Sequence, residues 1–135
     1  MKNTLNYLTV ISIICLSFFT ACSKNENNSL AGFQPEITNK TDNFQLQATN
    51  VSQVSTTIDY NWTNTGTMAS IDKSGILTSG TSRILIYDNN GTNVATSDLK
   101  ITGGETTTTG VAGLWKIRLE LSKYDGTLNF RVQKK

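Results

Sequence analysis

The feature that most constrains the fold is a series of short alternating apolar and polar runs from Phe44 onward. No sustained 3.6-residue period is found in this part of the chain, so we expect strands rather than helices. Residues 44–48 alternate, and residues 58–62 place Ile58, Tyr60 and Trp62 on one face of a strand. Segments rich in Ser, Thr, Asn and Gly separate the runs. We therefore predict an all-β body, an antiparallel two-sheet β-sandwich or jelly-roll of about eight strands.

One hairpin is predicted in the middle of this body. Strands over residues 83–88 and 93–97 are joined around Asn90-Gly91, a dipeptide that tolerates the positive φ angles of tight hairpin turns. The Gly- and Thr-rich stretch 103–113 follows. We expect it to be a connection, mobile or in contact with a partner, in which the Thr run forms a short exposed strand.

A second hairpin is predicted at the C-terminus, with Asp125-Gly126 as its two-residue turn. In that register apolar residues face apolar residues, and opposite charges pair on the other face. The predicted pairs are Leu121 with Phe130, Leu119 with Val132 and Glu120 with Arg131. Trp115 and Ile117 extend the same inward face.

The stretch from Arg83 to Val132 resembles secreted bacterial sandwich domains of the pre-peptidase C-terminal type. The resemblance rests on residues 84–97 and 113–132: a strand, an Asn-Gly turn, a "VA-S" strand, a loop, a Gly-x-Trp strand and a final Gly turn into a strand. It implies a fold rather than a function.

Composition excludes several classes of chemistry. The chain of 135 residues contains no His, which removes the usual general base at neutral pH and the commonest metal ligand. Its two cysteines, Cys15 and Cys22, both precede the body, which therefore has no thiol nucleophile or disulfide. The formal net charge of +2 gives no electrostatic reason to expect nucleic-acid binding. We expect no cofactor and no metal.

The N-terminal segment predicts export. Lys2 supplies a positive start, and an apolar run from Leu8 to Phe19 ends at Ala21-Cys22. The run is too short to cross a bilayer of about 30 Å as a helix, so it indicates a signal peptide that is removed.

Residues 18–22, Phe-Phe-Thr-Ala-Cys, resemble the lipobox of bacterial lipoproteins, with Phe19 at a position where Leu is more usual. The resemblance implies that Cys22 is diacylated and becomes the first residue of the mature chain. An ordinary signal peptide with an incidental Cys22 is the alternative. More than one acyl chain gives stable anchoring in a membrane.

The opening also resembles that of small lipoproteins of Bacteroidetes-type bacteria, in which charged residues after the Cys can direct export to the cell surface. Lys24 and Glu26 match that pattern only in part. The predicted organisation is a signal peptide at 1–21, a lipidated Cys and flexible tether at 22–43, and a β-sandwich domain at 44–135. We expect lipid anchoring at the outer membrane, on either the periplasmic or the surface side.

Candidate chemical sites in the body are few. Paired carboxylates for glycoside hydrolysis would have to come from Asp59, Asp88, Glu105 and Glu120, and single acids on strand faces are usually solvated. The segment 88–93 is oxygen-rich like a calcium loop. It lacks the bidentate Glu of an EF-hand, however, so we interpret it as a hairpin turn. A calcium site shared with Asp125 is the remaining alternative.

A sugar-stacking platform is a further alternative, formed from the aromatic residues Tyr60, Trp62, Tyr87, Trp115 and Tyr124. Trp62 and Trp115 lie on apolar strand faces, so we predict that they belong to the core. Tyr124, beside the predicted Asp-Gly turn, and then Tyr87 are the residues that we expect to be exposed and available to a ligand.

The sequence therefore predicts a lipid-anchored, non-enzymatic envelope lipoprotein that acts as a small binding or interaction module. Its expected partners are the membrane, through Cys22, and a glycan or an envelope protein. The alternative is a carbohydrate- or calcium-dependent ligand-binding module that serves a larger uptake or degradation system. A hydrolase that uses carboxylates alone is a third class.

Overall fold

The computed structural model describes residues 33–135, which form seven strands and no helix. The strands are β1 (Glu36–Lys40), β2 (Asn43–Asn64), β3 (Ala69–Lys73), β4 (Ile76–Tyr87), β5 (Asn93–Asp98), β6 (Gly103–Thr106) and β7 (Gly113–Lys134). Every pairing is antiparallel, so the predicted all-β antiparallel class is confirmed. Within this range no helix is long and apolar enough to cross a membrane.

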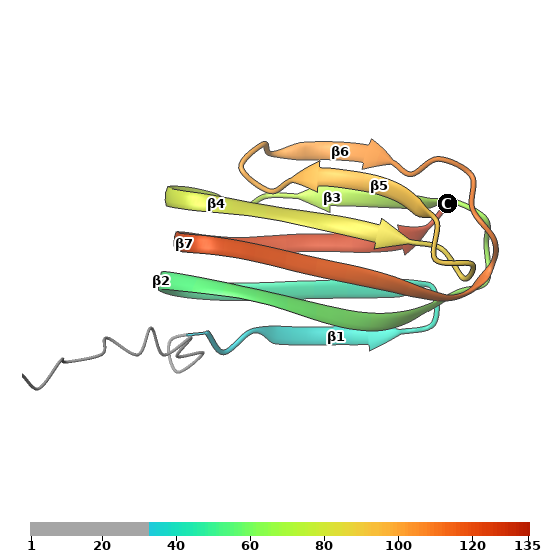
Figure 1. Ribbon diagram of the computed structural model, residues 1–135, viewed down its shortest axis with the longest axis horizontal. Helices are drawn as coiled ribbons and strands as arrows, with labels where there is room; N and C mark the ends of the chain where they lie inside the picture. The colour runs from blue at the N-terminus through green and yellow to red at the C-terminus, as the bar shows by residue number, and fades with distance from the viewer. Residues whose placement is uncertain (1–32) are drawn as a thin grey trace, which may run out of the picture.

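The two longest strands, β2 and β7, each contribute to two layers. In the back layer, residues 43–48 of β2 and 128–134 of β7 lie between β1 on one side and β3 with β6 on the other. In the front layer, residues 56–64 of β2 and 113–121 of β7 are followed by β4 and β5. Figure 1 shows the two halves of β2 and of β7 in separate layers, meeting at the end where the ribbons double back.

The core lies between these layers. Phe44 of the back half of β2 contacts Tyr60 of its front half, with ring centroids 5.4 Å apart. Trp62 and Trp115, which are paired neighbours on β2 and β7, make an edge-to-face contact at 5.9 Å. Burial of such large side chains is the main favourable term for a sandwich of this size. The predicted core positions of Trp62 and Trp115 are confirmed, since both are almost fully buried.

The predicted C-terminal hairpin is wrong, because β7 continues through Asp125-Gly126 as one bent strand. Gly126 has a φ of 147°, and a Cβ there would lie 2.0 Å from the carbonyl oxygen of Ile76. Its missing side chain therefore allows β4 to approach β7 at the bend.

The cross-strand pairs that depended on that hairpin are replaced. Leu119 pairs with Ile58 and Ile84, and Val132 pairs with Phe44 and Ile71. The predicted pair of Leu121 with Phe130 is replaced in the same way. Leu121 pairs with Thr56 and Ser82, and Phe130 pairs with Leu46 and Lys73.

The body begins earlier than predicted. Residues 33–43, assigned from the sequence to the tether, include the buried side chain of Phe33 and all of β1, which pairs with β2. The Trp62 indole nitrogen donates to the carbonyl oxygen of Lys40 at 3.1 Å, so β1 is joined to both layers. The predicted signal peptide, Cys22 and the tether up to residue 32 lie outside the described residues.

Candidate functional site

The outward-pointing side chains of the front layer form a polar surface, which we call the front face. Strand register brings its residues into three rows across β2, β7, β4 and β5. The rows are Thr57, Glu120, Arg83 and Asp98; then Asp59, Arg118, Leu85 and Thr96; then Asn61, Lys116, Tyr87 and Asn93. Side chains alternate between the two faces of a strand, so the residues that lie between these along each strand point into the core.

Charges on the front face are matched in pairs. Arg118 donates to both carboxylate oxygens of Asp59 at 2.7 and 2.9 Å, and Lys116 lies 3.6 Å from the same carboxylate. The hydrogen bond from Arg118 holds the pKa of Asp59 below its ordinary value against the opposing effect of partial burial. The face thus carries cations and anions together and has no strong field of either sign.

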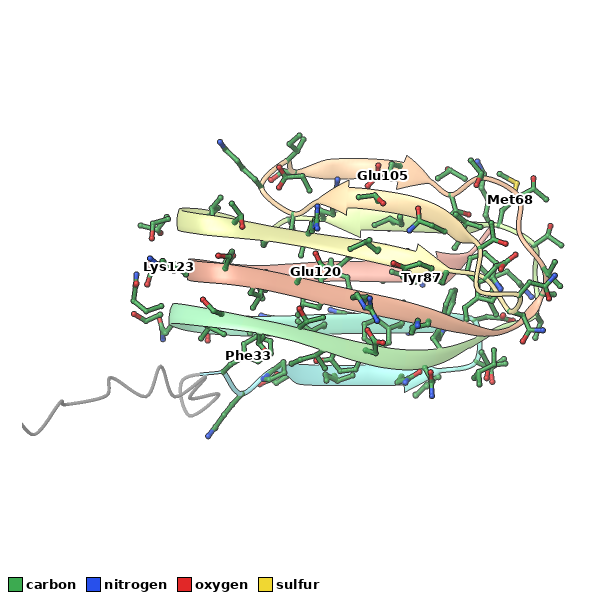
Figure 2. The ribbon with its side chains drawn as sticks, viewed as in Figure 1. Phe33, Met68, Tyr87, Glu105, Glu120 and Lys123 are labelled. Carbon is green, nitrogen blue, oxygen red and sulfur yellow. The ribbon has the colours of Figure 1, made fainter. Side chains whose placement is uncertain are left out.

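Tyr87 stands at one end of this charged array. The Lys116 Nζ lies 5.0 Å from the centre of its ring, and the Arg118 guanidinium carbon lies 5.8 Å away. Both separations fall within the range of cation–π contacts. Figure 2 shows Tyr87 and Glu120 on the front layer, at different positions along the strands.

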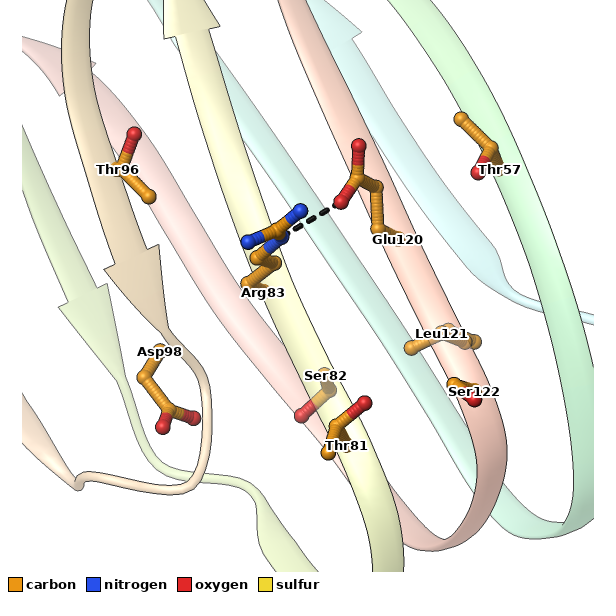
Figure 3. Close-up of a pocket in the computed structure, with 9 residues that line it drawn as sticks. All are labelled: Thr57, Thr81, Ser82, Arg83, Thr96, Asp98, Glu120, Leu121 and Ser122. Carbon is orange, nitrogen blue, oxygen red and sulfur yellow. Dashed lines mark hydrogen bonds and ion pairs between the residues drawn. The ribbon is translucent and has the colours of Figure 1, made fainter.

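A groove with a volume of about 630 Å³ opens at the Glu120 end of the front face. The Arg83 Nε donates to Glu120 Oε2 at 2.6 Å across its floor (Figure 3). Around that pair lie mostly hydroxyl groups and one further carboxylate, from Thr57, Thr81, Thr96, Ser122 and Asp98. The groove therefore offers many hydrogen-bond donors and acceptors and suits a neutral, hydroxyl-rich ligand better than a strongly charged one.

The structure separates the two tyrosines that the sequence singled out. Tyr87 lies on the front face, partly buried, as described above. The predicted exposure of Tyr124 is wrong: its side chain is 1% exposed and its hydroxyl lies 3.2 Å from the Ile76 carbonyl and 3.0 Å from that of Thr127. Because β7 bends instead of turning, Tyr124 lies beneath the bend and is part of the core.

The stacking platform, which the sequence left as an alternative, is not assembled. Trp62 and Trp115 are buried, and Tyr60 is half-buried with its ring against Phe44. Of the five aromatic residues considered for it, Tyr87 is the one on the front face. A stacking role would therefore fall on Tyr87 alone.

Asp88 stabilises a turn. One of its carboxylate oxygens accepts the backbone N–H groups of Asn90 and Thr92, and the other accepts that of Val111. Burial opposes ionisation of Asp88, but these three hydrogen bonds keep its pKa below the ordinary value. The predicted hairpin around Asn90-Gly91 is confirmed. The bond to Val111 also holds the end of the 103–113 stretch. The strand in that stretch, β6, runs over Gly103–Thr106 and not over the Thr run as expected, and Thr107 is buried.

Three other acids, Asp72, Glu105 and Glu120, are engaged in ion pairs, and the partner of Glu120 is Arg83 instead of the predicted Arg131. Arg131 pairs with Asp72 at 3.0 Å rather than with Glu120. Glu105 accepts a hydrogen bond from the buried Lys73 at 3.0 Å, and Lys73 also reaches Ser97 on the front layer. In the described part of the chain, no group of three or more His, Cys, Asp or Glu residues could hold a metal ion.

Sequence reasoning missed the front face as a unit. The alternation of Lys116, Arg118 and Glu120 with buried neighbours does predict that these three point outward together. Their partners on β2 and β4 follow only from the register of strands that are far apart in sequence.

A scan against protein-family models and a search of curated proteins found no match to the chain.

Proposed function

We propose that this chain is a lipid-anchored, non-enzymatic interaction module of a bacterial outer membrane, held there by acyl chains on Cys22. The apolar run that ends at Thr20-Ala21-Cys22 is the observation that carries the proposal. Residues 23–32 separate that Cys from Phe33, the first described residue. A segment of this length spans at most roughly 35 Å, so the body would stay close to the membrane surface.

The front face supports the interaction role. Its ion pairs and hydroxyl groups are held on paired strands, and sites on such rigid elements are well defined before a partner binds. The chain lacks His, and the acids considered for catalysis are bound in ion pairs or turn hydrogen bonds. A binding role therefore fits the residue types better than hydrolysis does.

Fractionation of cells tests the anchoring. Wild-type chain is expected in the outer membrane, the Cys22→Ala chain is expected to lose that location, and Cys15→Ala is the matched control. Protease treatment of intact cells then distinguishes the two sides of the membrane, with detection of an epitope placed after Lys135. Loss of the epitope indicates the surface side, and its protection indicates the periplasmic side. Recovery of Cys22→Ala in the outer membrane at the wild-type level would contradict the proposal.

A carbohydrate-binding role is the second candidate, and the hydroxyl-lined groove favours it. Calorimetry with neutral oligosaccharides should detect heat of binding that is reduced by Thr57→Val and Thr96→Val, which remove hydroxyls with little change of shape. Thr78→Val, on an exposed part of β4 outside the groove, is the control. The calcium-dependent variant of this idea has no support from Asp88, since its oxygens already accept three N–H groups.

A further inference from the structure

Strand β1 is an edge of the back layer. It pairs with β2 on one side, and among the described strands it has no neighbour on the other. All five residues are exposed, including Ile37 at 42%. Figure 1 shows β1 at the outer margin of the molecule. An exposed edge offers unpaired backbone donors and acceptors to another strand.

Its position is fixed from within the molecule. The carbonyl of Lys40 accepts from Trp62, and the Asn39 side chain donates to the carbonyl of Asn61 at 2.8 Å. These contacts with the front layer hold β1 in an extended form before any partner arrives. Such preorganisation lowers the entropic cost of adding a strand.

The sequence of β1, Glu-Ile-Thr-Asn-Lys, is complementary to itself in one arrangement. When two copies pair antiparallel about Thr38, Glu36 of each lies opposite Lys40 of the other, and Ile37 lies opposite Asn39. Glu36, Thr38 and Lys40 share a strand face, so both charge pairs form on the same side. Within residues 33–135 neither Glu36 nor Lys40 makes an ion pair.

We propose that β1 is a docking edge for β1 of a second copy of this chain, in a two-fold symmetric dimer. A strand without matching charges would leave Glu36 and Lys40 facing neutral or like-charged residues, which disfavours other occupants. The edge strand at the other side of the same layer, β6, carries one acid and no base, so it lacks this complementarity. The contact is small, and we expect a weak dimer that forms where copies are concentrated.

Disulfide trapping in the full chain tests the pairing. Antiparallel partners have Cα atoms about 4.5 to 5.5 Å apart, which suits a disulfide, so Thr38→Cys should give a covalent dimer on a non-reducing gel. The parent chain gives the background from Cys15 and Cys22, and Thr78→Cys on exposed β4 is the matched control. Cross-linking of Thr38→Cys at the level of Thr78→Cys would overturn the proposal.

Exchanging the charges of Glu36 and Lys40 tests whether the strand that docks on β1 is β1 of a second copy. In the Thr38→Cys chain, Glu36→Lys or Lys40→Glu alone should reduce the dimer about tenfold, because each places like charges opposite one another twice. The Thr38→Cys chain that carries both exchanges should dimerise as well as the Thr38→Cys chain with neither. A mixture of the two single variants, carrying different tags, should form mixed dimers in preference to either homodimer. Dimer yields that do not respond to these exchanges would show that another surface or partner is involved.

Discussion

Tyr124 and Asp88 show how single polar side chains stabilise irregular parts of this fold. The hydroxyl of Tyr124 lies between two carbonyl groups beneath the bend of β7, and the carboxylate of Asp88 accepts three backbone N–H groups at the β4–β5 turn. Backbone groups that leave a regular ladder in a buried position need such partners. Each residue was considered for ligand binding from the sequence, and each is used for internal stability.

Replacing Tyr124 should therefore affect stability. Tyr124→Phe is expected to lower the free energy of unfolding by about 1 kcal/mol, through loss of one buried hydrogen bond. Tyr124→Ala should cost about 3 to 5 kcal/mol, because it also leaves a cavity in the core. Urea denaturation followed by tryptophan fluorescence measures both. Tyr87→Phe is the control, and a Tyr124→Phe chain as stable as wild type would contradict the buried contact.

At the scale of elements, the bends of β2, β4 and β7 turn paired strands into two packed layers. Asn50, Gln53 and Lys123 have positive φ angles at these bends, and Lys123 lies at this end of the molecule in Figure 2. The carboxylate of Asp125 accepts the Gln53 N–H at 2.9 Å and also bonds the side chains of Gln53 and Ser79. One side chain of β7 thereby joins all three strands.

Alanine substitutions at Gly126 and Gly91 distinguish the bend of β7 from an ordinary hairpin turn. Gly126→Ala should lower the free energy of unfolding by about 3 kcal/mol, since its Cβ would clash with the Ile76 carbonyl as well as strain the backbone. Gly91→Ala should cost about 1 kcal/mol, because its surroundings are open and only the positive φ opposes Ala. Denaturation midpoints measure both. Equal costs at the two sites would favour a simple hairpin at Gly126.

These two sites also show what could be predicted from the sequence. Asn90-Gly91 and Asp125-Gly126 have nearly the same local signal, and only the first makes a hairpin. Apolar alternation continues on both sides of Asp125, so it fits a hairpin and a bent strand equally well. The deciding contact comes from Ile76, about fifty residues away. Strand β1 was missed because its five residues are exposed on both faces and show no alternation.

Removal of β1 should be costly. A chain that begins at residue 44 loses the buried Phe33, the pairing with β2 and the ion pair of Asp42 with Lys134. We expect it to be about 4 kcal/mol or more less stable than a chain that begins at residue 33. Parallel urea titrations of the two chains measure the difference. Equal stability would return the domain boundary to residue 44.

At the scale of the whole molecule, ionised carboxylates join the layers and loops. Lys73 of the back layer reaches Ser97 and Glu105, and Asp59 and Asp125 bind groups from neighbouring strands. Asp88 joins its turn to the loop at Val111. Burial opposes ionisation of Glu105, but hydrogen bonds from Ser97 and Lys73 keep its pKa lowered. Outward charged positions were readable from the sequence, while their pairing depended on the global register.

Stability should fall in acid for this reason. The pKa values of Asp59, Asp88, Asp125 and Glu105 are lowered on folding, so the unfolded chain binds more protons in acid. Their contribution is complete above the ordinary values of 3.8 for Asp and 4.5 for Glu and is lost as the pH falls through the lower folded values. Urea midpoints should hold at neutral pH and drop below about pH 4.5. Asp88→Asn should flatten that drop, whereas Thr78→Val should leave it unchanged; the same slope in Asp88→Asn and wild type would contradict the assignment.

The proposed lipid anchoring requires that the mature chain begin at Cys22 and carry acyl chains there. Intact-mass spectrometry of the protein extracted from host membranes, followed by analysis of its N-terminal peptide, measures both directly. We predict a chain that begins at Cys22 and carries a diacylglyceryl group on that residue. A mature chain that begins elsewhere, or an unmodified Cys22, would contradict the proposal of a lipid-anchored module.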